Sequence, residues 1–184
     1  MKDKIPFYNI VNMFFVGAVF TFFSVLLLYE QIPIDKIITY SDFLSDWSVI
    51  IGVVLLVIMF ELGFIINRLG SIIVAPILSK LKIWQKDPYG IDVSKISQRN
   101  QKFQSMITEL VLMRSHVMMF IILFVMSLIC SKYILSIFFA TMIVVFILGG
   151  KKHNDKINII RKHYHEEEEK EKEAEKKYES LVSL

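Results

Sequence analysis

The sequence predicts an all-α polytopic membrane protein with four transmembrane helices, a helical cytoplasmic loop and a charged C-terminal helix. Three observations lead to this fold class. Hydrophobic residues make up 54% of the 184 residues, and the mean hydropathy is +0.53. The apolar residues lie in blocks long enough to cross a bilayer, rather than at the spacing of an amphipathic soluble helix. The charged residues are segregated into a central loop and a tail, and Pro and Gly are scarce.

The first two spans are expected at residues 10–29 and 47–67. The first contains no charge, and about 20 residues at 1.5 Å each match the hydrocarbon thickness. Two lysines precede it, but it is longer than the apolar region of a signal peptide, which predicts an uncleaved span. Trp47 suits a membrane interface, and the apolar interior of the second span is interrupted only by Glu61.

The third and fourth spans are expected within residues 111–148. Lys132 is the only charged residue between positions 117 and 148. One helix of this length would measure about 48 Å, which exceeds the bilayer core. Residues 131–133 are therefore predicted to form a tight hairpin, and the third span borrows residues 110–113 to reach full length.

The positions of the basic residues predict the orientation. Of the 21 Lys and Arg residues, only Lys36 and Lys132 fall in the first and third connections between spans. The positive-inside rule places the other connection and both termini in the cytoplasm. The expected location is the bacterial inner membrane, with multiple passes.

Four segments follow from these spans: an N-terminal helical hairpin (1–67), a cytoplasmic loop (68–115), a second hairpin (116–150) and a tail (151–184). Residues 68–84 are expected to form an amphipathic helix bent at Pro76, on the inner headgroups or under the bundle. Residues 94–114 are expected to form a helix that feeds into the third span. In the tail, a solvated helix is expected from three Glu–Lys pairs at i,i+4, namely Glu166–Lys170, Glu168–Lys172 and Glu173–Lys177.

Glu61 is the only acidic residue inside a span, and a charge in hydrocarbon costs about 2.5 kcal/mol or more. We favour a structural pair between Glu61 and Arg68 or Arg114, ahead of a contact with a partner or a role in ion movement. Asn12, Gly17 and Thr21 form a small and polar face that suits close helix packing. That face fits packing within one chain or self-association, and we slightly favour a homo-oligomer.

The tail offers Tyr164, Tyr178, Leu181 and Leu184 as apolar contacts for a soluble cytoplasmic partner protein. His153, His163 and His165 are expected to lie on a solvated helix, and the spacing of the last two does not suit a metal site. The sequence contains no catalytic motif, so neither an enzyme nor a cofactor is expected. The basic loop is expected to contact membrane lipid rather than nucleic acid.

The order of features resembles that of small four-span membrane proteins of bacterial anti-phage defence loci, among them the Kiwa membrane subunit. The resemblance is carried by Phe7-Tyr8-Asn9, Gly63, Asn67-Arg68-Leu69-Gly70-Ser71, Pro76-Ile77-Leu78 and Arg114-Ser115. It covers most of the chain in layout but few residues in identity, and Val16-Gly17 stands where Pro-Gly is expected. The resemblance implies an inner-membrane sensor that oligomerises and holds a cytoplasmic effector at the membrane.

These observations favour a non-enzymatic sensor or scaffold that oligomerises and recruits a cytoplasmic effector. The alternative is a pore-forming or membrane-perturbing effector lined by Asn12, Thr21, Ser24 or Glu61. A small transporter is disfavoured because the two halves show no convincing repeat and the spans are not broken by Pro.

Overall fold

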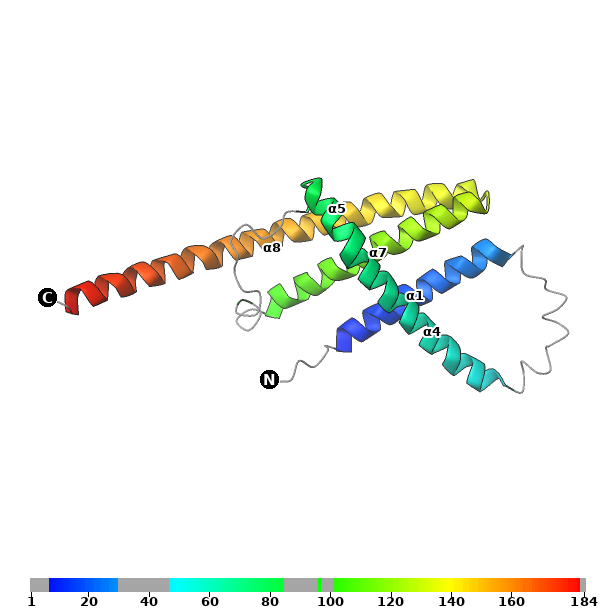
Figure 1. Cartoon of the computed structure of the whole chain (residues 1–184), viewed down its shortest axis with the longest axis horizontal. Coiled ribbons are helices and arrows are strands. Elements are labelled where there is room, and N and C mark those ends of the chain that lie inside the picture. The colour runs from blue at the N-terminus through cyan, green and yellow to red at the C-terminus, as the bar shows by residue number, and fades with distance from the viewer. Residues whose placement is uncertain (1–6, 30–46, 85–95, 97–100, 183–184) are drawn as a thin grey trace.

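The computed structural model describes residues 7–29, 47–84, 96 and 101–182 (Figure 1). Four helices in these ranges are long and apolar enough to cross a membrane, which confirms the predicted fold class. They belong to α1 (Phe7–Leu28), α4 (Ser48–Leu69), α7 (Gln101–Ile129) and α8 (Tyr133–Val182). The described residues contain no strand.

The helix that begins as α4 does not end at residue 67. It continues through a π-helical turn, η2 (Gly70–Val74), into α5 (Ala75–Lys80). The amide of Ala75 donates to the carbonyl of Gly70, five residues back, and this wider turn makes room for the proline that follows. The expected separate helix bent at Pro76 is therefore an extension of the second span, and the irregularity precedes the proline.

Two turns of the same kind end α5 and α7. Lys82 and Ser131 each have a φ of +56°, the left-handed conformation that closes a helix C-terminus. The amide of Ile83 donates to Leu78 O at 3.0 Å, and the amide of Lys132 donates to Ser127 O at 2.8 Å. The second turn falls inside the hairpin predicted at residues 131–133.

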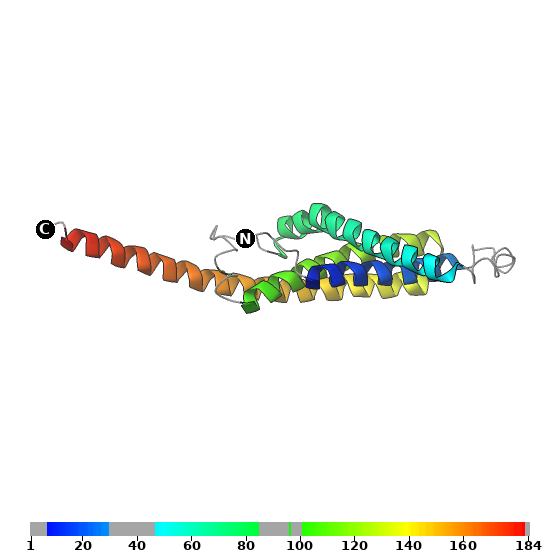
Figure 2. The ribbon, with the colours of Figure 1, turned by 90° about the horizontal axis from the view of Figure 1, so that it is seen from below.

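The fourth span and the tail form one uninterrupted helix of 50 residues. At 1.5 Å per residue α8 is about 75 Å long, more than twice the thickness of a hydrocarbon core. Its second half extends well beyond the other helices (Figures 1 and 2). We refer to the end of the bundle where α8 leaves it as the tail end, and to the end at Ser131 as the hairpin end.

The helix α7 is the centre of the bundle, because it packs against α1, α4, η2 and α8. Its buried residues include Val117, Met119 and Leu123, which meet Phe139 of α8 and Val16 of α1 in one core. Seen from below, α4 lies over one side of the other helices (Figure 2). It contacts α1 and α7.

A second, smaller core lies at the tail end. It contains Ile96, Phe103 and Met106, with Ile157 of α8. The predicted helix at residues 94–114 corresponds to the start of α7, although only Ile96 is described among residues 94–100. This core binds α7 to α8 before α8 continues alone.

Candidate functional site at the tail end of the bundle

The structure does not bring the three predicted charge partners together. Glu61 is exposed on α4, and Arg68 lies with its guanidinium carbon 5.0 Å from the centre of the Phe64 ring. Among the described residues, Glu61 forms no ion pair with Arg68 or Arg114. Glu61 and Arg68 share a face, but seven residues separate them by about 10 Å along the axis, which exceeds a direct contact.

Gly17 lies where α1 crosses α4. A Cβ atom added to Gly17 would stand 1.6 Å from Met59 O, and one added to Gly63 would stand 1.7 Å from Met13 O. Only glycine permits such backbone contact. The Thr21 hydroxyl donates to Gly17 O at 2.8 Å, so it is satisfied within its own helix. The face expected to serve packing or self-association is thus covered by α4 of the same chain.

Asn12 belongs to a polar junction where α1, α4 and α7 meet. It lines a cavity of about 60 Å³ with Asn67 and Ser115. The Ser115 hydroxyl donates to Asn67 Oδ1 at 2.8 Å and also lies 3.0 Å from Val111 O. The Ser71 hydroxyl donates to Asn67 O at 3.1 Å. Asn67 therefore joins the second span to α7, a role that the sequence analysis did not anticipate.

A cavity of about 410 Å³ opens between η2 with α5, α7 and α8, and we call it the Arg114 cavity. Its lining combines one charged residue with small polar and apolar ones: Arg114, Ser71, Ser79, Asn154, Trp84, Ala75, Pro76, Ile107, Leu110 and Val111. The Nε atom of Arg114 is closed to solvent and has no hydrogen-bond partner. Among the described residues, the lining thus combines this guanidinium with no acidic side chain.

Trp84 forms one wall of the Arg114 cavity and fastens α5 to α8. Its indole Nε1 donates to Ile147 O at 3.3 Å. A Cβ atom added to Gly150 would stand 2.2 Å from Trp84 Cζ2, so the ring requires a glycine there. The sequence carried a signal for this contact, a Gly149-Gly150 pair just before Lys151-Lys152, but its partner lies 66 residues earlier.

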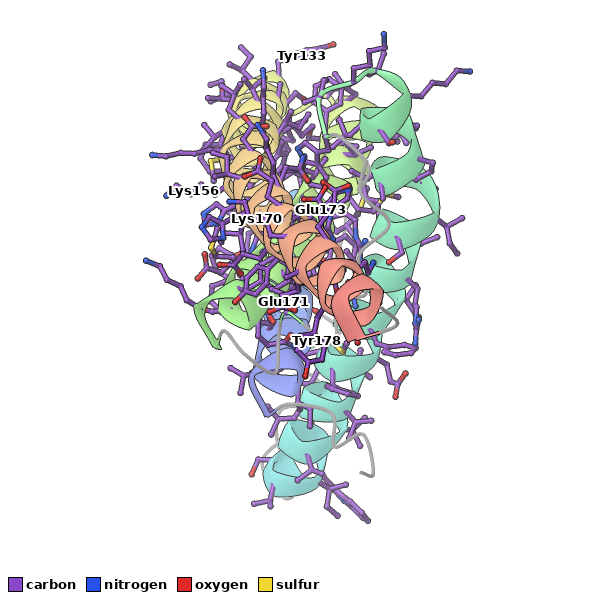
Figure 3. All side chains as sticks on the ribbon, turned by 90° about the vertical axis from the view of Figure 1, so that its left-hand side faces the viewer. Tyr133, Lys156, Lys170, Glu171, Glu173 and Tyr178 are labelled. Carbon is purple, nitrogen blue, oxygen red and sulfur yellow. The ribbon has the colours of Figure 1, made fainter. Side chains whose placement is uncertain are left out.

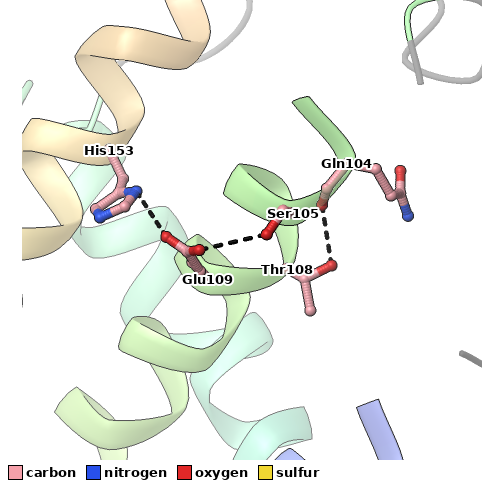
Figure 4. Close-up of polar contacts among 5 residues, drawn as sticks. All are labelled: Gln104, Ser105, Thr108, Glu109 and His153. Carbon is pink, nitrogen blue, oxygen red and sulfur yellow. Dashed lines mark hydrogen bonds and ion pairs between the residues drawn. The ribbon is translucent and has the colours of Figure 1, made fainter. Parts of the chain in front are cut away.

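An ion pair joins α7 to α8 near the small core. Oε2 of Glu109 lies 3.3 Å from His153 Nδ1, and the Ser105 hydroxyl donates to Oε1 of Glu109 at 3.3 Å (Figure 4). The contact with His153 lacks the alignment of a hydrogen bond, and we treat it as an ion pair. Because the carboxylate stands between serine and histidine, the imidazole cannot activate the hydroxyl as a general base does.

The other tail histidines pair along their own helix. His163 lies 3.4 Å from Glu167, His165 lies 3.9 Å from Glu169, and Lys162 lies 3.8 Å from Glu166. Pairs at i,i+4 stabilise an isolated helix modestly. No group of His, Cys, Asp or Glu among the described residues is arranged to hold a metal ion.

The four predicted docking residues lie in different environments, and not all of them are described. Tyr164 packs against the small core, so it stabilises the base of the tail. Tyr178 is 69% exposed on α8 (Figure 3). Leu181 lies on the last described turn of α8, although its side chain is not described, and Leu184 lies outside the described residues. Tyr178 is therefore the docking residue that the structure places on the surface.

One buried histidine was missed by the sequence analysis. His116 of α7 stacks on Phe146 of α8, with ring centres 4.6 Å apart and planes 7° apart. Its Nδ1 lies 2.9 Å from Leu112 O. With one nitrogen bonded to its own helix and its ring among phenylalanines, His116 is part of the core between α7 and α8.

Comparison with protein-family models, with curated proteins and with solved structures gives no match. The function of the chain is therefore inferred from its own residues and their geometry.

Proposed function

We propose that the chain is a non-enzymatic membrane scaffold that holds a soluble partner protein at the membrane through the tail of α8. The observation that carries this proposal is the continuity of α8 from Tyr133 to Val182. A partner on the tail would be fixed to the four-helix bundle without a flexible joint. The small core and the Glu109–His153 ion pair support α8 where it leaves the bundle.

The surface of the tail suits a soluble partner. Residues 166–175 are almost entirely charged, and most of their side chains are exposed (Figure 3). An exposed charged helix offers electrostatic complementarity, which favours specific and rapid association. The distribution of Lys and Arg supports a cytoplasmic location for this helix. The resemblance to anti-phage defence proteins supplies the biological setting of the proposal, a sensor at the inner membrane that oligomerises and recruits an effector.

Removal of residues 167–184 tests the proposal, because this deletion spares Ile157 and Tyr164 of the small core. The full-length and shortened proteins are purified from crosslinked native membranes, and the captured soluble proteins are identified by mass spectrometry. We expect a stoichiometric soluble partner with the full chain and its loss from the shortened one. Equal capture by both proteins would contradict docking on the tail. Elution of the shortened protein from a sizing column in detergent controls for folding.

A second function, an oligomeric pore, is favoured by one observation. Glu61 is exposed on α4, close to residues 53–58, which are apolar and exposed all around the helix. A carboxylate facing lipid is costly, so Glu61 would require water or a second copy beside it. Ion flux through liposomes that contain the protein, compared between Glu61→Gln and the exposed control Asp155→Asn, tests the pore. Absence of flux with the unmodified protein would exclude it.

A further inference from the structure

The Arg114 cavity contains a partly buried positive charge that no described lining residue neutralises. Arg114 lies on the part of α7 that is apolar enough to cross a bilayer. Its backbone oxygen and Cγ approach the position of a Cβ on Gly70 to 3.2 and 3.5 Å, so the base of the side chain is packed against η2. None of the described residues that line the cavity is acidic. Because a partly buried charge is costly without a counter-charge, the cavity favours an anion as its ligand.

We propose that the Arg114 cavity binds the phosphate of an anionic phospholipid headgroup. A guanidinium can donate two parallel hydrogen bonds to phosphate oxygens. Ser79 places a hydroxyl on the same lining, where it can donate to a remaining oxygen. The volume of about 410 Å³ lies within the range of small-molecule sites.

The surroundings favour a lipid over a free phosphate ion. Most of the described lining residues are apolar, Ala75, Ile107 and Leu110 among them, as the glycerol and the first acyl carbons of a lipid require. Ile72 and Ile77, on the same η2–α5 segment, are 70% and 50% exposed and offer a surface for an acyl chain.

Exposed lysines place the cavity near the membrane boundary. Lys80 is the last residue of α5 and Lys82 lies in the turn after it, while Lys151 and Lys152 follow the glycine that contacts Trp84. Basic residues at this level attract anionic headgroups, and basic pockets between spans bind them. An anionic lipid is preferred over phosphatidylcholine because the described lining residues offer no carboxylate to receive a choline cation.

The test uses the full chain with Trp47 replaced by Phe, so that Trp84 in the cavity wall is the only tryptophan. Delipidated protein in neutral detergent is titrated with phosphatidylglycerol, with phosphatidylcholine and with inorganic phosphate, and the emission of Trp84 is followed. Native mass spectrometry counts the bound lipids. We expect saturable binding of phosphatidylglycerol, weaker binding of phosphatidylcholine, and no displacement of lipid by millimolar phosphate.

Two variants and a matched control assign the binding to the cavity. Arg114→Gln removes the charge and should weaken phosphatidylglycerol binding about tenfold. Arg68→Gln, an arginine on the outer face of α4 against Phe64, should leave binding unchanged. Ser79→Leu fills the cavity while keeping Arg114, and it should also weaken phosphatidylglycerol binding. This variant tests the site if Arg114→Gln does not fold.

Three results would overturn the proposal. The first is equal binding of the two lipids, which would remove the role of the negative charge. The second is displacement of the lipid by inorganic phosphate alone, which would make the ligand a free ion. The third is equal loss in the Arg68 and Arg114 variants, or no loss with Ser79→Leu, which would place the binding elsewhere.

Discussion

The two helix pairs of the bundle are held together in different ways. The helices α1 and α4 meet at one crossing, where Gly17 and Gly63 bring the two backbones into contact. On the N-terminal side of this crossing α4 is largely uncovered, and residues 53–58 are exposed on every side. The helices α7 and α8 instead pack along their length, from the Ser127–Ser136 hydrogen bond of 2.7 Å at the hairpin end to the small core at the tail end.

This difference predicts how each pair responds to mutation. Association of helices in a bilayer depends on close packing and polar contacts, because lipid tails are as apolar as the side chains. A pair that meets at one point depends on the residues at that point. A pair that packs along its length distributes its association free energy over many contacts, so each residue contributes a smaller share.

The largest effect is expected from Gly17→Ala. The new Cβ would overlap Met59 O, which belongs to the backbone and cannot rotate away, so the two helices must separate. We expect a loss of about 3 kcal/mol or more in the free energy of unfolding, at or beyond the usual cost of overpacking. Thermal unfolding in detergent, followed by the loss of the monodisperse sizing peak, measures it.

Gly52→Ala is the matched control for this prediction. A Cβ on Gly52 of α4 would meet no atom within 4 Å, so the substitution adds only helix propensity. We expect unchanged or slightly raised stability. If both glycine variants unfold at the same temperature, the crossing is not the contact that holds α1 to α4.

The number of spans and the 131–133 turn were predictable because both depend on local sequence. Length and charge determine how much chain can cross a bilayer, and Lys132 interrupts an apolar run that is too long for one span. The continuation of α4 beyond residue 67 was not predictable. It depends on the π turn at Gly70 and on its contact with Arg114, two features separated by 44 positions.

The candidate sites depend even more on contacts distant in sequence. Gly17 was recognised as a packing residue, but its partner Gly63 could not be identified from spacing alone. The expected pairing of Glu61 follows from the cost of an unpaired charge in a span. In the structure, however, Glu61 is exposed on α4 and the guanidinium of Arg68 lies over the Phe64 ring. One wall of the Arg114 cavity is Trp84, whose contact with Gly150 joins residues 66 positions apart.

The second prediction concerns the distributed pair. Leu123 of α7 is 0% exposed, and truncation to Ala leaves a cavity among neighbours that can partly relax. We expect a loss of about 2 kcal/mol in the free energy of unfolding, at the low end for buried leucines. The loss is small because a leucine that packs between helices leaves lipid rather than water, so it gains little transfer free energy. Leu128→Ala on the same helix, at a leucine that is 44% exposed, should change stability by less than about 0.5 kcal/mol. A larger loss for Leu123→Ala than for Gly17→Ala would reverse the comparison.

The third prediction addresses the polar junction that connects the two pairs. Ser115→Ala removes the donor to Asn67 Oδ1, and we expect a loss of about 1 kcal/mol. Thr141→Val is the control, because the Thr141 hydroxyl donates only to Ile137 O of its own helix on an exposed face. Unfolding in detergent should separate the two variants. If Ser115→Ala is as stable as the control, the hydrogen bond contributes nothing to the attachment of α4 to α7.

The smallest effect is expected where α7 and α8 leave the bundle. Glu109 and His153 are only partly exposed, at 38% and 23%, but their ion pair borders water and is screened by salt. In acidic buffer, where the imidazole carries its proton, Glu109→Gln should cost less than about 1 kcal/mol at low salt and nearly nothing in molar sodium chloride. Hydrogen exchange of the amides of residues 153–160 detects such a change, because the small core below the pair remains intact. An increase in exchange that persists at high salt would mean that Glu109 supports the tail by packing rather than by charge.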